Sequence, residues 1–376
     1  MASCLTSCKL LRPNQIVLAC LLPPIRPNTA SSNSTNIHSV TFVTLTMTKG
    51  IHYYAARGDI AGVTAELAQG TPVDYIHPGD KMELTALMAA SSSPMAGTDM
   101  LQYLISRGAN INSFRGFESN LPLQRAIQRS TLEKVLCLVD AGADVHYRRP
   151  SGHDAVLDAV YSCRLDRNPH IVTIIDFLLS KGIPGNPVPP TEYGGALRTA
   201  AFHARFDVVK RLLDAGAPID ALGWTPLMHA VALGELTEVE YLLTTDHFSQ
   251  DELDSAWLLS IRADDVNKAQ CLLNSGANRN ACDCLGRTAL MHTLPNKFST
   301  MRWLLAEGVD AEIRDSLKKT VLQIAAYDEC PAGVEALLQG GVSPASITDE
   351  DFRLLEGTGN CEIRTLLNVY GWTPSS

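Results

Sequence analysis

The chain has 376 residues, of which 45% are hydrophobic, and a formal net charge of −9 at pH 7. Residues 1–46 contain three basic and no acidic residues, so the remainder of the chain carries −12. An acidic body lacks the electrostatic surface that direct nucleic-acid binding needs, and it favours a basic partner surface. No apolar run approaches the roughly 18 residues of a membrane helix, so we expect no membrane span.

Residues 1–46 differ in composition from the rest of the chain, being rich in Ser, Thr, Asn and Pro. They are typical of a disordered tail. A second reading is an artefact of gene prediction, since Met47 is a sensible start just before the first repeat. An organelle transit peptide is the third reading: the missing acids fit it, and the presence of only two arginines argues against it. The composition leaves all three open.

An apolar pair followed by a turn residue recurs nine times from residue 66 onward. The spacings between successive turn positions are 38, 34, 40, 34, 30, 30, 32 and 33 residues. A period near 33 means that one structural unit stacks on copies of itself. The turn positions are Gly70, Gly108, Gly142, Gly182, Gly216, Asp246, Gly276, Gly308 and Gly341.

A second string precedes each apolar pair and is clearest at 223–230, Gly-Trp-Thr-Pro-Leu-Met-His-Ala. The Thr can cap a helix, the Pro suits the first helical turn, and the Leu and Ala form an apolar stripe. The apolar pair belongs to a second short helix, which the following Gly ends. Each unit is therefore predicted to be helix, turn, helix and extended loop. Further copies begin near Thr85, Leu121, Asp154, Gly195, Ser255, Thr288 and Thr320.

These two strings resemble the ankyrin repeat family, whose signature is Thr-Pro-Leu-His-x-Ala followed by Leu-Leu-x-x-Gly-Ala. The resemblance covers about residues 50–344; copy 221–246 matches best, and copies 147–182 and 250–276 are degenerate. It implies an all-α solenoid of stacked helix-turn-helix units with projecting hairpin-like fingers. The divergent copies resemble those of fungal ankyrin proteins, a group in which transcriptional regulators occur.

We expect an array of eight to nine units over 47–344, in which 51–59 begins an N-terminal cap, and capping helices over 345–376. A terminal unit needs a polar outer face because nothing stacks on it. The residues expected to supply this face are Glu350, Asp351, Arg353, Glu356, Glu362 and Arg364.

No phosphate-binding loop, nucleophile elbow or metalloprotease motif occurs in the chain. Cys282 and Cys284 lack the second Cys/His pair of a zinc site, so they are interpreted as two unlinked thiols. The family resemblance makes His229 and His292 structural. The clusters 264–265 and 349–351 are interpreted as solvated faces or helix starts. We therefore expect no enzymatic activity, metal or cofactor.

Partner contacts are expected where the copies differ, on the fingers and on the exposed side of the first helices. Finger 112–120 offers Phe114, Arg115 and Phe117, and the next finger offers Tyr147, Arg148 and Arg149. Aromatic and Arg side chains are the usual interface anchors. Trp224 either joins this surface or packs against a neighbouring finger. An insertion at 162–169 and a Pro/Gly-rich loop at 183–194 are either added function or tolerated surface extensions.

The function expected is a non-enzymatic, monomeric scaffold for protein partners. A transcriptional co-regulator that binds a basic DNA-binding factor without touching DNA is the specific role suggested by analogy. The alternatives are a substrate-recruiting adaptor of a ubiquitin ligase and a cytoskeletal or membrane-protein anchor. The ten cysteines follow no secreted disulfide spacing, so we expect an intracellular protein of the cytoplasm or nucleus.

Overall fold

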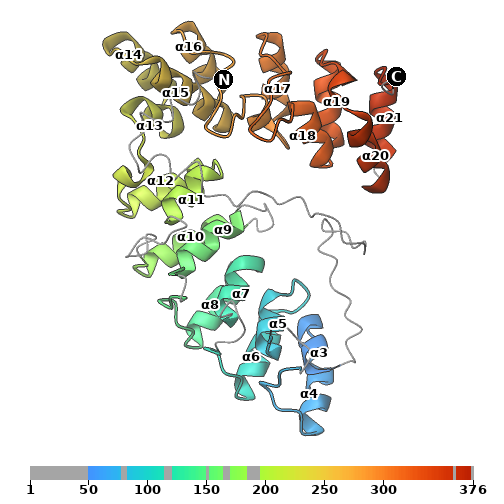
Figure 1. Ribbon diagram of the computed structural model, residues 1–376. Coiled ribbons are helices and arrows are strands. Elements are labelled where there is room, and N and C mark those ends of the chain that lie inside the picture. Colours follow the sequence, from blue (N-terminus) through green and yellow to red (C-terminus); the bar gives the residue numbers. More distant parts are fainter. Residues whose placement is uncertain are drawn as a thin grey trace. The chain divides into compact units, whose positions relative to one another are not determined.

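The computed structural model of the chain describes residues 50–77, 83–113, 121–149, 152–163, 170–183, 195–358 and 361–373. Within these ranges every regular element is a helix, and the β structure is one isolated bridge between Cys282 and Thr288. Consecutive helices lie side by side as pairs that follow one another in chain order (Figure 1). The predicted all-α stack of helix pairs is confirmed.

The described residues form two compact units, 50–222 and 223–373, here called the N-terminal and C-terminal units. In the N-terminal unit the first helices α3, α5, α7, α9 and α11 pack in that order, and the second helices α6, α8, α10 and α12 do the same. The helices are α3 (Ile51–Arg57), α4 (Ile60–Ala68), α5 (Ala86–Ser92), α6 (Thr98–Ser106), α7 (Pro122–Arg129), α8 (Leu132–Asp140), α9 (Ala155–Cys163), α10 (Ile171–Ser180), α11 (Ala196–Phe202), α12 (Phe206–Asp214) and the 3-10 turn η1 (Ile219–Leu222).

In the C-terminal unit α13 packs on α15 and α15 on η2, while α17 packs on α19 and α19 on α21. The last pair, α20 and α21, is joined to the preceding repeat through α18 and α19. The helices are α13 (Pro226–Leu233), α14 (Leu236–Thr245), α15 (Gln250–Arg262), α16 (Val266–Asn274), η2 (Met291–Thr293), α17 (Phe298–Ala306), α18 (Val321–Tyr327), α19 (Pro331–Gln339), η3 (Pro344–Ser346), α20 (Asp349–Thr358) and α21 (Cys361–Val369).

The predicted helix starts are confirmed at three recurring threonines. Thr85, Thr225 and Thr320 each accept a hydrogen bond at 3.3 Å from the backbone amide three residues later. Such a cap satisfies one of the amides that the first helical turn leaves without a partner. Asp265 caps α16 in the same way, accepting from the Lys268 amide at 3.0 Å, as predicted for the 264–265 pair.

The second helices end as the repeated glycines predict. Gly142 has φ +98° and donates to the Val139 carbonyl at 3.0 Å, while the Ala143 amide donates to the Leu138 carbonyl at 2.9 Å. This left-handed ending satisfies the last carbonyls of the helix and turns the chain toward the next loop.

The repeated leucines form the apolar seam. Leu87, Leu227 and Leu322 of the first helices, and Leu104, Leu138 and Leu272 of the second, are 0% exposed. Burying one such side chain contributes roughly 1.5–3 kcal/mol. Because every copy supplies the same apolar positions, each repeat is stabilised by its neighbours.

Two first helices differ from expectation. The helix begun at Thr288 is only the 3-10 turn η2, since Pro295 has no amide proton and restricts Leu294 against helical geometry. In the degenerate copy 250–276, α15 begins at Gln250 and not near Ser255. Ser249 and Glu252 form a capping box there and extend the helix by a turn.

None of the described helices is both long and apolar enough to cross a bilayer.

Candidate functional site

Asp158 is the centre of a polar cluster at the first helix α9. Its side chain is 1% exposed, and its Oδ2 accepts a hydrogen bond at 2.5 Å from the Tyr147 hydroxyl. The Arg149 guanidinium donates to Oδ1, and the His153 Nδ1 lies 3.9 Å from that same oxygen. The finger that precedes α9 therefore folds back onto the helix through a buried ion pair.

Two ring side chains and an exposed arginine belong to the same finger and helix as this buried pair. The rings of His153 and Tyr161 stack at 5.2 Å with an interplanar angle of 5°, and both side chains are half-buried. Arg148, the residue before Arg149 in the finger, is exposed. These three residues, on the finger and helix that the Asp158 cluster joins, are the candidate contact surface.

Burial sets the protonation states of the cluster. Burial raises the pKa of Tyr147, although the Arg149 charge opposes this effect. Burial also lowers the pKa of His153, and the Arg149 charge adds to that effect. Tyr147 and His153 are therefore neutral at pH 7 beside the charged Arg149. Perturbed titratable groups at a partly open surface are typical of binding sites, although structural ion pairs also produce them.

The structure describes three of the six predicted partner-contact residues. Arg148 is exposed on the finger that precedes α9, whereas Tyr147 is only 7% exposed and its hydroxyl donates to Asp158. Trp224 is half-buried, and its ring lies 5.3 Å from that of His229 in an edge-on arrangement within the same repeat. Phe114, Arg115 and Phe117 lie outside the described residues, as do most of the insertion 162–169 and of the loop 183–194.

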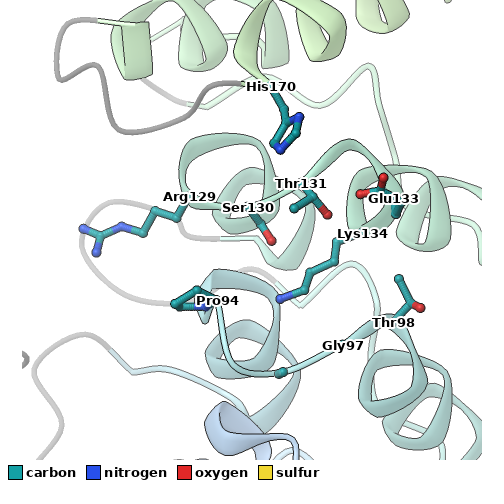
Figure 2. A pocket seen from close by; sticks show the side chains of 10 residues that line it. Pro94, Gly97, Thr98, Arg129, Ser130, Thr131, Glu133, Lys134 and His170 are labelled. Atoms are coloured by element: carbon teal, nitrogen blue, oxygen red, sulfur yellow. The ribbon is translucent and has the colours of Figure 1, made fainter.

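A pocket of about 460 Å³ opens in the N-terminal unit where second helices begin (Figure 2). Its lining includes Gly97, Thr131 and His170, the residues that precede α6, α8 and α10. Lys134 also lines it, but its ammonium group donates to the carbonyls of Ala90 at 3.0 Å and Ser93 at 2.5 Å. Burial lowers the pKa of Lys134. The amine is therefore committed to the neighbouring repeat and is not available to a ligand in the pocket.

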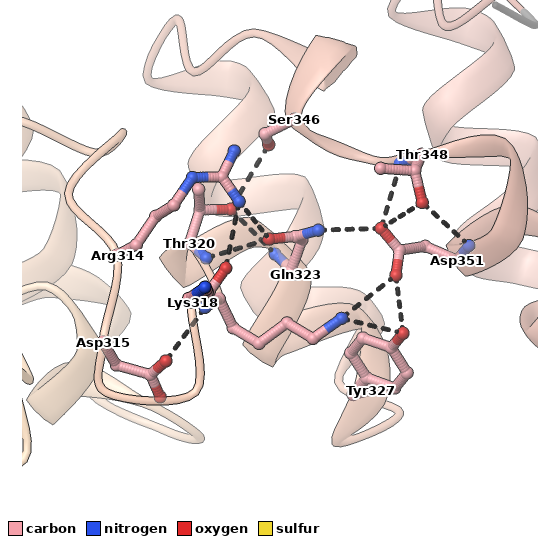
Figure 3. Close-up of polar contacts among 10 residues, drawn as sticks. Arg314, Asp315, Lys318, Thr320, Gln323, Tyr327, Ser346, Thr348 and Asp351 are labelled. Carbon is pink, nitrogen blue, oxygen red and sulfur yellow. Dashed lines mark hydrogen bonds and ion pairs between the residues drawn. The ribbon is translucent and has the colours of Figure 1, made fainter.

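At the end of the chain, Asp351 ties α20 to the last repeat (Figure 3). Its carboxylate accepts from the Gln323 amide at 2.7 Å, the Tyr327 hydroxyl at 2.5 Å, the Thr348 amide at 2.9 Å and the Lys319 ammonium at 3.3 Å. Burial opposes its ionisation, but the hydrogen bonds from Tyr327, Thr348 and Gln323 outweigh this effect and lower the pKa of Asp351. The prediction that Asp351 lies on a polar outer face is wrong: the side chain is buried because four partners replace its water.

The finger 282–288 places His292 against Asp283, with Nε2 and Oδ2 3.2 Å apart. Burial lowers the pKa of His292, and the Arg262 charge adds to this effect although Asp283 opposes it. Cys282 contacts the Asn280 carbonyl at 3.6 Å, and Cys284 is exposed. In the ranges that the structure describes, no group of three His, Cys, Asp or Glu residues is arranged to hold a metal ion.

Asp158 and Lys134 were not identified as important positions from the sequence, and Asp351 was identified with the wrong role. A signal for Asp158 existed, since it is a charged residue on a short first helix whose copies elsewhere carry Ala89, His229 or Ile324. Nothing comparable marked Lys134 or Asp351, because their partners come from other repeats.

The comparisons with known proteins agree with this architecture. The family of ankyrin repeats, taken as three copies, matches residues 161–252 and 257–349. An ankyrin repeat and KH domain-containing protein of Caenorhabditis briggsae is 24% identical over 205 residues, which is 54% of this chain and 8% of that protein. The chain thus matches a small part of that relative's length. With the repeat period, the threonine-capped first helices and the glycine-terminated second helices all in place, the chain is an ankyrin repeat protein.

Proposed function

We propose that this protein is a non-enzymatic, monomeric adaptor inside the cell that holds a protein partner on its first helices and fingers. Ankyrin repeats are protein-interaction modules, and the consensus positions of this chain are used in packing. What remains for recognition is the set of side chains that differ from copy to copy.

The observation that carries this proposal is the surface over Asp158. The stacked His153 and Tyr161 rings with Arg148 offer an aromatic and cationic contact area. Its support is fixed by the Asp158–Arg149 ion pair and the Tyr147 hydroxyl, so little conformational entropy is lost on binding. The fingers 112–120 and 147–149 precede α7 and α9, and Phe114, Arg115 and Phe117 stay predicted contacts.

A transcriptional co-regulator is the specific role that we propose within this function. Residues 223–376 contain 22 acidic and 11 basic residues, a net charge of −11, while residues 47–222 contain 18 and 17, a net charge of −1. Such a field favours encounter with a basic protein, as many DNA-binding factors are. The location that we propose for this protein is the nucleus, the cytoplasm or both.

Affinity capture from native cells, with the full chain as bait, tests the proposal. The double variant Arg148→Ala with Tyr161→Ala should lose the partner, whereas Arg107→Ala, an exposed arginine on a second-helix end of the same unit, should retain it. A separate variant with Phe114, Arg115 and Phe117 all changed to Ala tests the neighbouring finger. If both multiple variants fold and still retain every partner, the proposed surface is wrong.

The identity of the captured protein decides the specific role. A DNA-binding factor supports the co-regulator. Ubiquitin-transfer components would instead identify a substrate-recruiting adaptor, and filament or membrane proteins would identify an anchor.

A further inference from the structure

The C-terminal unit carries a basic surface on an acidic body. We define the finger surface as Arg287, Arg314, Leu317, Lys318, Lys319 and Tyr327, which come from two successive fingers and the helix α18. Four of the 11 basic residues within 223–376 are on it, Lys319 among them, although acidic residues are twice as numerous in that segment. Charge is therefore distributed unevenly between this surface and the rest of the unit.

The two fingers are joined and internally fixed. The Ser316 amide donates to the Leu285 carbonyl at 2.8 Å. Within the second finger, Asp315 Oδ1 accepts from the amides of Leu317 and Lys319, both at 2.9 Å. Asp283 holds the first finger in the same manner, accepting from the amides of Leu285 at 2.8 Å and Arg287 at 2.9 Å. The side chains between these bonds are displayed on a preorganised backbone.

Three carboxylates next to the finger surface are used by the protein itself. Asp283 and Asp315 bind backbone amides of their own fingers, and Asp315 is 8% exposed. Asp351, which reaches Lys319 and Tyr327 from α20, is 5% exposed and fully engaged in its own network (Figure 3). Asp351 pairs with Lys319 at 3.3 Å, and none of the three carboxylates forms an ion pair with Arg287, Arg314 or Lys318.

The other three cations are not paired with a carboxylate of the described residues; Arg314 and Lys318 are exposed, and Arg287 is half-buried. Among the described residues Arg287 and Lys318 form no ion pair. Arg314 donates to neutral acceptors, the Lys318 carbonyl at 3.0 Å and the Gln323 amide oxygen at 3.4 Å, so its charge is not cancelled.

Apolar surface accompanies this charge. Leu317 is 64% exposed at the tip of the fixed finger, and Tyr327 is 41% exposed with its ring 4.4 Å from the Lys319 ammonium. An exposed large aliphatic side chain on a rigid loop is typical of a contact surface when charged residues surround it.

We propose that the finger surface binds an acidic peptide segment of the partner protein, whose carboxylates pair with Arg287 and Lys318 while an aliphatic side chain covers Leu317. The inference rests on the proposed adaptor function and names the chemistry of a recognised segment. A polyanionic nucleic acid fits less well, since it has no aliphatic group to cover Leu317, which is 64% exposed.

Fluorescence anisotropy with the full chain tests this directly. The probes are a fluorescein-labelled peptide of repeated Glu-Glu-Leu, its Lys-Lys-Leu counterpart and a single-stranded oligonucleotide. The acidic peptide should bind, and rising salt should weaken it. Arg287→Glu with Lys318→Glu should weaken it about tenfold, because two attractive pairs become repulsive. The matched control is Arg302→Glu, an exposed arginine on the second helix α17, which should change the affinity less than about twofold.

Leu317→Ser removes the apolar contact and keeps the charges. It should weaken binding of the acidic peptide while leaving the salt dependence of that binding unchanged. Absence of acidic-peptide binding, equal effects of Arg302→Glu and the double reversal, or tighter binding of the basic peptide or the oligonucleotide would each overturn the inference. Capture of the cellular partner keeps the two proposals apart. A partner retained by the double-reversal chain contradicts the finger surface alone, while a wild-type chain without any protein partner contradicts the adaptor function.

Discussion

The ammonium group of Lys268 lies 2.7 Å from the carbonyl oxygen of Gly234 and 3.0 Å from that of Val231. A lysine at the start of one second helix thus satisfies the carbonyl end of the first helix in the preceding repeat, where the helix dipole favours a cation. Lys134 makes the same contact to the end of α5, and Lys297 makes it to the end of α15. The recurrence in both units makes it a polar contact between repeats beside the apolar seam.

Replacing this lysine should destabilise the C-terminal unit. Lys268→Met keeps most of the buried stem but leaves two carbonyls without their donor, so the free energy of unfolding should fall by about 1–3 kcal/mol. Chemical denaturation checks this. Lys210→Met, at an exposed lysine of α12, serves as the control, and equal losses for the two variants would contradict the interpretation.

Asp351→Asn should loosen the last helix pair in a pH-dependent way. At pH 7 the loss of a charged acceptor with four partners should cost about 2–3 kcal/mol. The pKa of Asp351 is lowered by folding, so its contribution is complete above the unfolded-chain value near 4 and is lost as pH falls through the folded value. The difference in denaturation midpoint between wild type and variant should therefore shrink below pH 4. Glu350→Gln, at an exposed neighbour, is the matched control and should change the free energy of unfolding at pH 7 by less than about 0.5 kcal/mol.

Asp158→Asn should destabilise the N-terminal unit by about 3 kcal/mol, because Arg149 would then be a partly buried charge without its counter-ion. The unfolding midpoint in denaturant measures the effect, and Asp140→Asn on exposed surface is the matched change. If both variants unfold at the wild-type midpoint, the ion pair does not stabilise the finger.

Gly286→Ala should disturb the joined fingers. Gly286 has φ +71°, and an added Cβ would lie 3.1 Å from the Ser316 amide nitrogen and 3.2 Å from Asp315 backbone atoms. We expect a loss of about 1–2 kcal/mol in the free energy of unfolding and weaker binding of the acidic peptide. Gly341→Ala shares the positive φ, +89°, but meets no atom within 4 Å, so it should leave peptide binding unchanged.

The helix starts could be predicted because their cause is local. Thr85, Thr225 and Thr320 accept a hydrogen bond from an amide three residues away. Leu87, Leu227 and Leu322, which follow them at a fixed spacing, are all buried. Prediction was wrong where a local detail was overlooked, as at the Ser249–Glu252 capping box that lengthens α15.

The polar contacts between repeats had no such local signature. Asp351 reads as one of three consecutive acids at a helix start, yet its partners Gln323 and Tyr327 are more than 20 residues earlier in the chain. The sequence predicts Tyr147 to be an exposed aromatic residue of a finger, yet its hydroxyl donates a hydrogen bond to the buried Asp158.

The amino-acid sequence by itself determined the ankyrin fold, since a repeated pattern of caps, apolar pairs and turn glycines specifies the same unit wherever it occurs. Only the tertiary structure decided which charges are buried and which face outward. The energy of a charge depends on its surroundings, and those surroundings are assembled from residues of neighbouring repeats. The acidic total of the chain therefore did not reveal the basic surface on its joined fingers.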